Sequence, residues 1–240
     1  MKLLLLLFTG LKFGKLLSTG GTMLLSVVAY AWIFGWWYAV GFVGLLFVHE
    51  MGHYVAARQR GLAVGAPTFI PFLGAWITMK DMPADVETEA HVAIAGPFLG
   101  ALAAFGVYFW ALQADSRLLL AVAYSGFFLN LFNLLPVSPL DGGRITAIIS
   151  PRIWLLGAPL MVALLFYRPS PALFIVALLA APQVVKAWNY DPNAEENRAY
   201  YDVPGKVRVE YGVIYLGLTA VLAIMTYSVH EMLSSGRPFS

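Results

Sequence analysis

The chain has 240 residues, of which 60% are hydrophobic and 12% are charged, and its formal net charge is +2 at pH 7. A soluble globular domain is nearer half apolar and a quarter charged, so this chain lacks the polar residues that a water-exposed surface requires. The small charge gives no support to a nucleic-acid partner, and the lack of cysteine excludes disulfides, thiolate metal ligands and a cysteine nucleophile.

Long hydrophobic stretches predict transmembrane helices, because about 20 helical residues cross the hydrocarbon core of a bilayer. The first stretch, MKLLLLLF, ends early and has no convincing cleavage site, so we expect a short interfacial segment rather than a secretory signal. The sequence predicts an all-α polytopic membrane protein, with residues 1–240 forming a single domain. About seven spans are expected, at 18–34, 36–58, 90–112, 118–136, 144–167, 171–187 and 209–230. Pro151 should kink the fifth span or split off a short leading helix.

Two segments between the expected spans are not predicted to cross the membrane. Residues 61–89 join the second and third spans, and Pro67 and Pro71 forbid a continuous helix there. Their apolar, β-prone first part predicts a small membrane-associated β-hairpin at 62–80, with its backbone satisfied by protein or a wet cavity. Residues 188–206 are polar, contain Pro and Gly, and predict a cytoplasmic loop before the extra C-terminal span.

The distribution of lysine and arginine predicts the orientation, because these residues accumulate on the cytoplasmic side of membrane proteins. If the N-terminus is cytoplasmic, only Arg117, Arg168 and Arg237 of the 15 basic residues lie outside. We therefore expect a multi-pass protein of the cell membrane, with its N-terminus in the cytoplasm and its C-terminus outside.

A His-Glu-x-x-His motif lies at the cytoplasmic end of the second expected span, as His49-Glu50-Met51-Gly52-His53. Residues four apart share one face of a helix, so both imidazoles can reach a single ion. Glu50 lies one step around the helix, where it suits a general base acting on metal-bound water. The residue frequencies give about 0.002 chance matches to this motif. Because ionisable residues inside a membrane are costly and usually functional, ordinary core histidines are a much weaker explanation.

A catalytic zinc ion takes three protein ligands and leaves one position for water, so a third ligand is required. In the absence of cysteine it should be His, Asp or Glu. His91 begins the third span and His230 lies at the outer end of the last one, which makes both weaker candidates. Asp141 follows the fourth span at the depth of the motif. Prolines before it break the helix, and glycines after it permit a tight turn that aims its carboxylate into a cavity.

Two motifs stand two spans apart in the sequence: His49-Glu50-x-x-His53 and Asn133-x-x-Pro136-x-x-x-x-Asp141-Gly142. Together they resemble the paired signatures of the site-2 protease family of intramembrane zinc metalloproteases. The resemblance covers roughly residues 36–145, the core of the expected domain. Gly96-Pro97, near the start of the third span, also resembles a feature of that family.

The resemblance implies the chemistry of the site. One Zn²⁺ per chain would be bound near the cytoplasmic side by His49, His53 and Asp141. Glu50 would activate the attacking water, and Asn133 would help to hold the substrate carbonyl or its oxyanion.

The implied reaction is regulated intramembrane proteolysis of a single-span membrane protein, cut in or near its transmembrane segment. A helix hides its peptide bonds in internal hydrogen bonds, so the target span must unwind locally. By resemblance, residues 67–79 would pair with the unwound substrate as a strand, which satisfies the freed backbone groups.

Other functions fit the sequence less well. A rhomboid-type serine protease would require Gly-x-Ser-Gly, and the nearest match, Ala123-Tyr124-Ser125-Gly126, lacks the first glycine. An intramembrane aspartyl protease needs two facing aspartates, and Asp115 should lie outside. A metal transporter often has two related halves, which are not found. A catalytically silent relative, which only binds metal or substrate, would usually have lost Glu50 or a ligand.

Overall fold

The computed structural model describes residues 19–72, 74–78, 81–167 and 169–235. The expected interfacial segment, within residues 1–18, lies outside this part of the chain. Six of the basic residues used to predict the orientation also lie outside it: Lys2, Lys12, Lys15, Lys80, Arg168 and Arg237.

The elements along the chain are α3 (Thr19–Phe34), α4 (Trp36–Gln59), β1 (Thr68–Ile70), β2 (Gly74–Trp76), α5 (Val86–Gln113), α6 (Arg117–Asn133), α7 (Asp141–Ala147), the 3-10 helix η1 (Pro151–Ile153), α8 (Trp154–Tyr167), α9 (Pro171–Trp188), α10 (Glu195–Tyr200) and α11 (Gly205–Ser235).

The structure confirms a mostly helical chain with a small antiparallel sheet. Within the described residues, α4, α5 and α11 are long and apolar enough to cross a membrane. The other apolar helices, α3, α6, α8 and α9, are shorter. The expectation of about seven spans therefore stays a prediction, and three candidate spans are established by length and composition.

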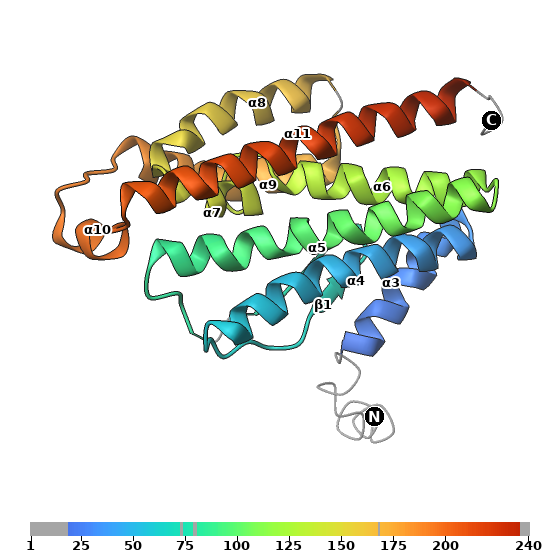
Figure 1. The fold of residues 1–240 in the computed structure, drawn as a ribbon, viewed down its shortest axis with the longest axis horizontal. Coiled ribbons are helices and arrows are strands. Elements are labelled where there is room, and N and C mark those ends of the chain that lie inside the picture. Colours follow the sequence, from blue (N-terminus) through green and yellow to red (C-terminus); the bar gives the residue numbers. More distant parts are fainter. Residues whose placement is uncertain (1–18, 73, 79–80, 168, 236–240) are drawn as a thin grey trace, which may run out of the picture.

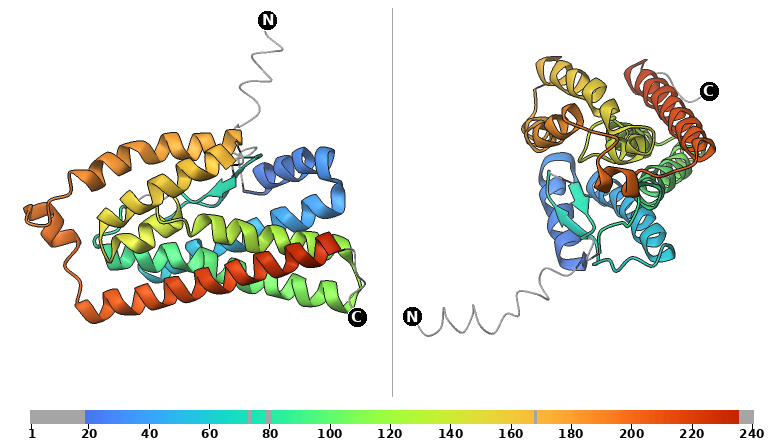
Figure 2. Two further views of the ribbon diagram at one scale, coloured as in Figure 1. Left: turned by 90° about the horizontal axis from the view of Figure 1, so that it is seen from above. Right: turned by 90° about the vertical axis from the view of Figure 1, so that its left-hand side faces the viewer.

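The long helices α4, α5, α6 and α11 run in one general direction and form the body of the molecule (Figure 1). α5 packs between α4 and α6, while α3 lies against α4 and α11 lies against α6. The pair α8 and α9 packs beside α7 (Figure 2). In the core, buried alanines such as Ala101 and Ala104 of α5 belong to one cluster with Leu120 and Phe127 of α6. Such small residues allow two helix backbones to approach closely.

The fifth expected span is broken, as its proline predicted. Pro151 opens η1, and Ser150 caps that turn by accepting a hydrogen bond from the Arg152 backbone N–H. The short helix α7 thus precedes the break and α8 follows it. One detail of the prediction is wrong: Gly142 and Gly143 lie inside α7 and not in a turn.

Those two glycines serve close packing instead. A Cβ on Gly142 would overlap the backbone of Leu134, and one on Gly143 would overlap the backbone around Ser138. Without side chains at these positions, α7 lies directly on the segment that follows α6. The chain therefore folds back on itself between α6 and α7, which brings Asp141, the first residue of α7, against the bundle.

The predicted hairpin between the second and third helical stretches is confirmed, although its strands are shorter than 62–80. β1 and β2 pair antiparallel, with Phe69 opposite Ala75. Phe69 is buried against α3 and α4, in a cluster that includes Tyr30 and Leu46. The polar 188–206 segment contains one short helix, α10, and α11 begins just inside its predicted end.

Candidate metal centre

The two histidines of the motif project from the same face of α4. Their Nε2 atoms are 3.1 Å apart, and the side chains are largely buried between α4, α5 and α7. The i, i+4 spacing on a regular helix accounts for this convergence without any distortion of α4. The motif therefore brings two imidazole rings to one point inside an apolar bundle.

Asp141 completes a triangle of donor atoms. Its Oδ2 lies 3.3 Å from Nε2 of His49 and 3.3 Å from Nε2 of His53. Within the described ranges, these three side chains form the one group of His, Cys, Asp or Glu that could hold a metal ion. Tetrahedral zinc with bonds of about 2.0–2.1 Å separates its ligand atoms by about 3.3–3.4 Å. The triangle matches that spacing, and two imidazoles with one carboxylate are donors that zinc accepts.

Hydrogen bonds at the far sides of both rings leave Nε2 as the nitrogen that faces the triangle. Nδ1 of His53 is 2.8 Å from the carbonyl oxygen of Val92, which can only accept, so Nδ1 carries the proton. Nδ1 of His49 is 2.8 Å from Oδ1 of Asn130. A neutral imidazole with Nδ1–H presents its Nε2 lone pair to a metal, so both rings are oriented as ligands require.

Helix α5 approaches α4 closely enough to form one wall of the centre. A Cβ on Gly52 would overlap the backbone at Ala95, and a Cβ on Gly96 would overlap the ring of His53. The Gly96-Pro97 feature noted in the sequence thus provides the space for a ligand ring. Glycine is required at these two positions by the approach of neighbouring atoms rather than by backbone conformation.

Glu50 lies beside the triangle and is only 5% exposed. It is close enough to interact electrostatically with both histidines and with Asp141. Among the described residues, no side-chain hydrogen bond or ion pair joins its carboxylate to another group. A buried carboxylate that is adjacent to the ligands and not held by another group is available to accept a proton.

Asp141 is held in place from outside the triangle. The Trp154 indole N–H donates to the carbonyl of Gly143 at 2.8 Å, and the Tyr215 hydroxyl donates to the carbonyl of Leu134 at 2.7 Å. These bonds satisfy buried carbonyls on α7 and on the segment before it. They tie the third candidate ligand to α8 and α11, helices outside the core that resembles the site-2 proteases.

The structure places the other predicted residues differently. His91 and His230 are not part of the triangle, and the ring of His230 lies against that of Tyr124 at 5.7 Å between centroids. Asn133 donates from Nδ2 to the carbonyl of Leu129, one turn earlier in its own helix, at 3.2 Å. The roles assigned to His49, Glu50, His53, Asn133 and Asp141 stay predictions, while the proximity of the three candidate ligands is a feature of the structure.

Asn130 is a residue of the site that the sequence analysis missed. It is fully buried, and it is the amide that contacts a candidate ligand. A signal was present, because a buried amide in an apolar helix is costly without hydrogen-bond partners. Asn133, three residues later, belongs to the motif that resembles the family signature, whereas Asn130 does not.

The 188–206 segment is hydrogen-bonded to the end of the bundle where α5 begins and α7 lies. The Tyr200 hydroxyl donates to Glu89 at 2.6 Å, and Glu89 in turn pairs with Arg144 of α7 at 3.5 Å. Burial, reinforced by the charge of Glu89, raises the pKa of Tyr200, which keeps its hydroxyl protonated as a donor. Arg208 donates to four backbone carbonyls: those of Ile148, Ile149, Tyr201 and Val203.

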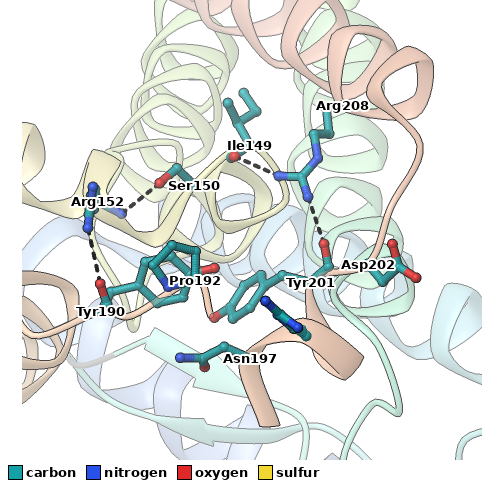
Figure 3. A pocket seen from close by; sticks show the side chains of 10 residues that line it. Ile149, Ser150, Arg152, Tyr190, Pro192, Asn197, Tyr201, Asp202 and Arg208 are labelled. Atoms are coloured by element: carbon teal, nitrogen blue, oxygen red, sulfur yellow. Dashed lines mark hydrogen bonds between the residues drawn. The ribbon is translucent and has the colours of Figure 1, made fainter. Parts of the chain in front are cut away.

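A pocket of about 500 Å³ lies under this segment (Figure 3). Its lining includes Arg152, Tyr190, Tyr201 and Arg208, and none of the three candidate ligands. Figure 3 shows Arg208 directed to the backbone oxygens of Ile149 and Tyr201. The pocket therefore lies between the 188–206 segment and residues 149–152, and none of the candidate metal ligands lines it.

Comparison with known proteins identifies relatives over part of the chain. The model of Peptidase family M50 matches residues 37–116, which include α4, the hairpin and α5. The matched region contains His49, Glu50 and His53, whereas Asp141 lies beyond it and is connected to the site by the structure. The resemblance to the site-2 protease family is confirmed by this match and by the named relatives.

Three of those relatives are named zinc metalloproteases. Rip3 of Mycobacterium tuberculosis, named a putative zinc metalloprotease, is 35% identical, over 48% of this chain and 31% of its own length. MJ0392 of Methanocaldococcus jannaschii is 33% identical, over 48% of this chain and 36% of its own. EGY1, a chloroplastic protein of Arabidopsis thaliana named a probable zinc metalloprotease, is 28% identical, over 44% of this chain and 28% of its own. The chain thus spans about a third of the length of the relatives that it matches.

Proposed function

We propose that this chain, a relative of the site-2 proteases of Peptidase family M50, is an intramembrane zinc endopeptidase. It would hydrolyse a peptide bond in or near a transmembrane segment of a membrane-protein substrate. The observation that carries the proposal is the convergence of His49, His53 and Asp141 from two helices onto one point, with Glu50 beside them. The zinc metalloprotease relatives support the choice of metal.

The proposed chemistry assigns one task to each side chain. The two imidazoles and Asp141 would hold Zn²⁺, which when bound polarises the scissile carbonyl and lowers the pKa of water. Glu50 would accept the proton of the attacking water and deliver it to the leaving amine. Asn133 donates one amide hydrogen to Leu129, which leaves its second N–H to stabilise the oxyanion of the substrate.

The hairpin offers one edge to an unwound substrate. The outer edge of β1 is already used, because the Phe69 N–H donates to the Thr22 hydroxyl of α3 at 3.2 Å. Phe69 lies opposite Ala75. Because the Phe69 N–H is directed to α3, the two residues form a non-hydrogen-bonded pair, in which the N–H and C=O groups of both residues face away from the partner strand. Ala75 therefore directs its backbone groups to the outer side of β2. We assign the substrate strand to the β2 edge.

The proposed location is a cell membrane, with the site near the cytoplasmic side. α7 lies in the half of the molecule nearer α10 (Figure 1), and α10 belongs to the segment that the basic residues predict to be cytoplasmic. Water would reach the centre more easily from that side than from the middle of the bilayer. The charge distribution and the placement of α7 support the same arrangement.

Cleavage of a model substrate tests the proposal. Purified full-length protein should cut a single-span membrane substrate in detergent, and a zinc chelator should abolish the cut. Glu50→Gln should remain folded and zinc-loaded, with activity reduced at least about 100-fold, because general acid–base catalysis contributes that much or more. Retained activity in this variant would remove Glu50 from the mechanism. Zinc without cleavage in the unaltered protein would identify a catalytically silent relative.

A further inference from the structure

We infer that Asn130 positions His49 for zinc by fixing which ring nitrogen carries the proton. The inference rests on the proposed function, because it concerns a ligand of the proposed metal. Asn130 is on α6, 81 residues from His49 in the sequence, and its side chain is fully buried. It is a positioning residue, since it acts through the ring that it contacts.

The orientation of the amide follows from its second partner. Nδ2 of Asn130 donates to the carbonyl of Gly126 at 2.7 Å. A carbonyl oxygen can only accept, so the amide nitrogen must face Gly126 and Oδ1 must face the imidazole. Oδ1 is likewise an acceptor, so the Nδ1 atom of His49, 2.8 Å away, must be the protonated nitrogen. In the neutral ring Nε2 is then the lone-pair donor, and it faces Asp141 and His53.

The two histidines differ in how this is achieved. His53 is held by the backbone carbonyl of Val92, which no substitution removes. His49 depends on a side chain, so the tautomer of one ligand can be tested by changing Asn130 alone. Within the described residues, Asn130 is the one side chain hydrogen-bonded to Nδ1 of either histidine.

Helix α5 supplies the space for the amide. A Cβ on Gly100 would overlap the Oδ1, Cγ and Nδ2 atoms of Asn130. The amide therefore occupies the space that a side chain at residue 100 would fill. Aspartate has the same shape as asparagine and keeps an acceptor on the ring side, but it also places an oxygen against the carbonyl of Gly126, where the amide N–H donates, so it is not a neutral replacement.

A mechanical role in joining α6 to α4 is distinguishable from this one. Ser125, also on α6, contacts the hydroxyl of Tyr38 on α4 at 2.6 Å. Removal of that contact loosens the same pair of helices without touching a ligand. Ser125→Ala is therefore the matched control for any Asn130 variant.

The test is zinc affinity of the purified full-length protein, measured in detergent by competition with a chromogenic chelator. Asn130→Leu should bind zinc about 10–100-fold more weakly, the usual effect of removing a partner behind a metal ligand. Ser125→Ala should bind close to the unaltered protein. The visible spectrum of the Co²⁺ form should change in Asn130→Leu and not in Ser125→Ala.

A second pair of variants leaves Asn130 itself unchanged. Gly100→Ala should displace the amide and weaken zinc binding, whereas Gly106→Ala on the same helix meets no atom within 4 Å and should not. Unaltered zinc affinity in Asn130→Leu or Gly100→Ala, or an equal loss in Ser125→Ala, would overturn the inference. An unaltered protein that binds no zinc, or a His49→Ala variant that binds it normally, would instead refute the proposed function.

Discussion

Gly96 illustrates how single residues control the candidate metal centre. The ring of His53 occupies the space where a Cβ of residue 96 would lie. Gly96→Ala should force the ring aside, reduce the free energy of unfolding by about 1–3 kcal/mol through overpacking, and prevent stoichiometric zinc binding. Metal analysis of the purified variant, together with thermal unfolding, measures both effects.

The control for this prediction lies on the same helix. Gly106 of α5 has open space around its Cα, so Gly106→Ala should keep both zinc and stability. The helical circular dichroism of both variants should equal that of the unaltered protein. A Gly96→Ala variant that binds one zinc ion per chain would show that His53 is not held against α5 as described.

At the scale of elements, the two hairpin strands differ in what their outer edges can do. The edge of β1 is bonded to α3 through Phe69, while Ala75 of β2 directs its N–H outward. Ala75→Pro removes that N–H without removing a hydrogen bond between the strands. We expect cleavage of a transmembrane substrate to fall at least about 10-fold, the equivalent of about 1.4 kcal/mol in an edge hydrogen bond that is lost.

Zinc content separates this effect from damage to the site. Ala75→Pro should bind zinc as the unaltered protein does, because the hairpin contributes no ligand. Ala75→Ser keeps the N–H and should cleave normally. If Ala75→Pro cleaves at the normal rate, the substrate does not pair with β2.

At the scale of the molecule, the orientation in the membrane can be measured directly. The chain has no cysteine, so an introduced cysteine is a unique label. The turn between α5 and α6 and helix α10 lie at opposite ends of the structure (Figure 1). In intact cells, a membrane-impermeant maleimide should label Ala114→Cys, in that turn, and should reach Glu196→Cys, in α10, only after permeabilisation.

The opposite labelling pattern would invert the orientation, and the candidate metal centre would then open to the outside. Labelling of both positions in intact cells would show that α5 and α11 do not place their ends on two sides of a membrane. Either result would contradict the prediction that most of the basic residues are cytoplasmic. That prediction rests only on where lysine and arginine occur in the sequence, and no contact in the structure supports it.

Several features were predictable from local properties of the sequence. The helices, the break at Pro151 and the hairpin depend on composition, proline chemistry and β propensity, which act over a few residues. The candidate ligands were predictable because zinc chemistry restricts the residue types and because residues four apart share a helix face. The number of spans was harder to predict, because α3, α6, α8 and α9 are apolar but shorter than the helices that could cross a membrane.

The sequence by itself determined a helical, membrane-type chain with a His-Glu-x-x-His motif and a matching aspartate. Only the tertiary structure decided which groups are hydrogen-bonded to the histidine rings and which hairpin strand is bonded to α3. It also decided that Gly142 and Gly143 pack against backbone inside α7. The physical reason is the rotation of each helix about its axis. Apolar residues surround these helices on most sides, so their pattern does not indicate which face meets which neighbour. The partners of the two rings lie 39 and 81 residues away in the chain, and packing alone brings them together.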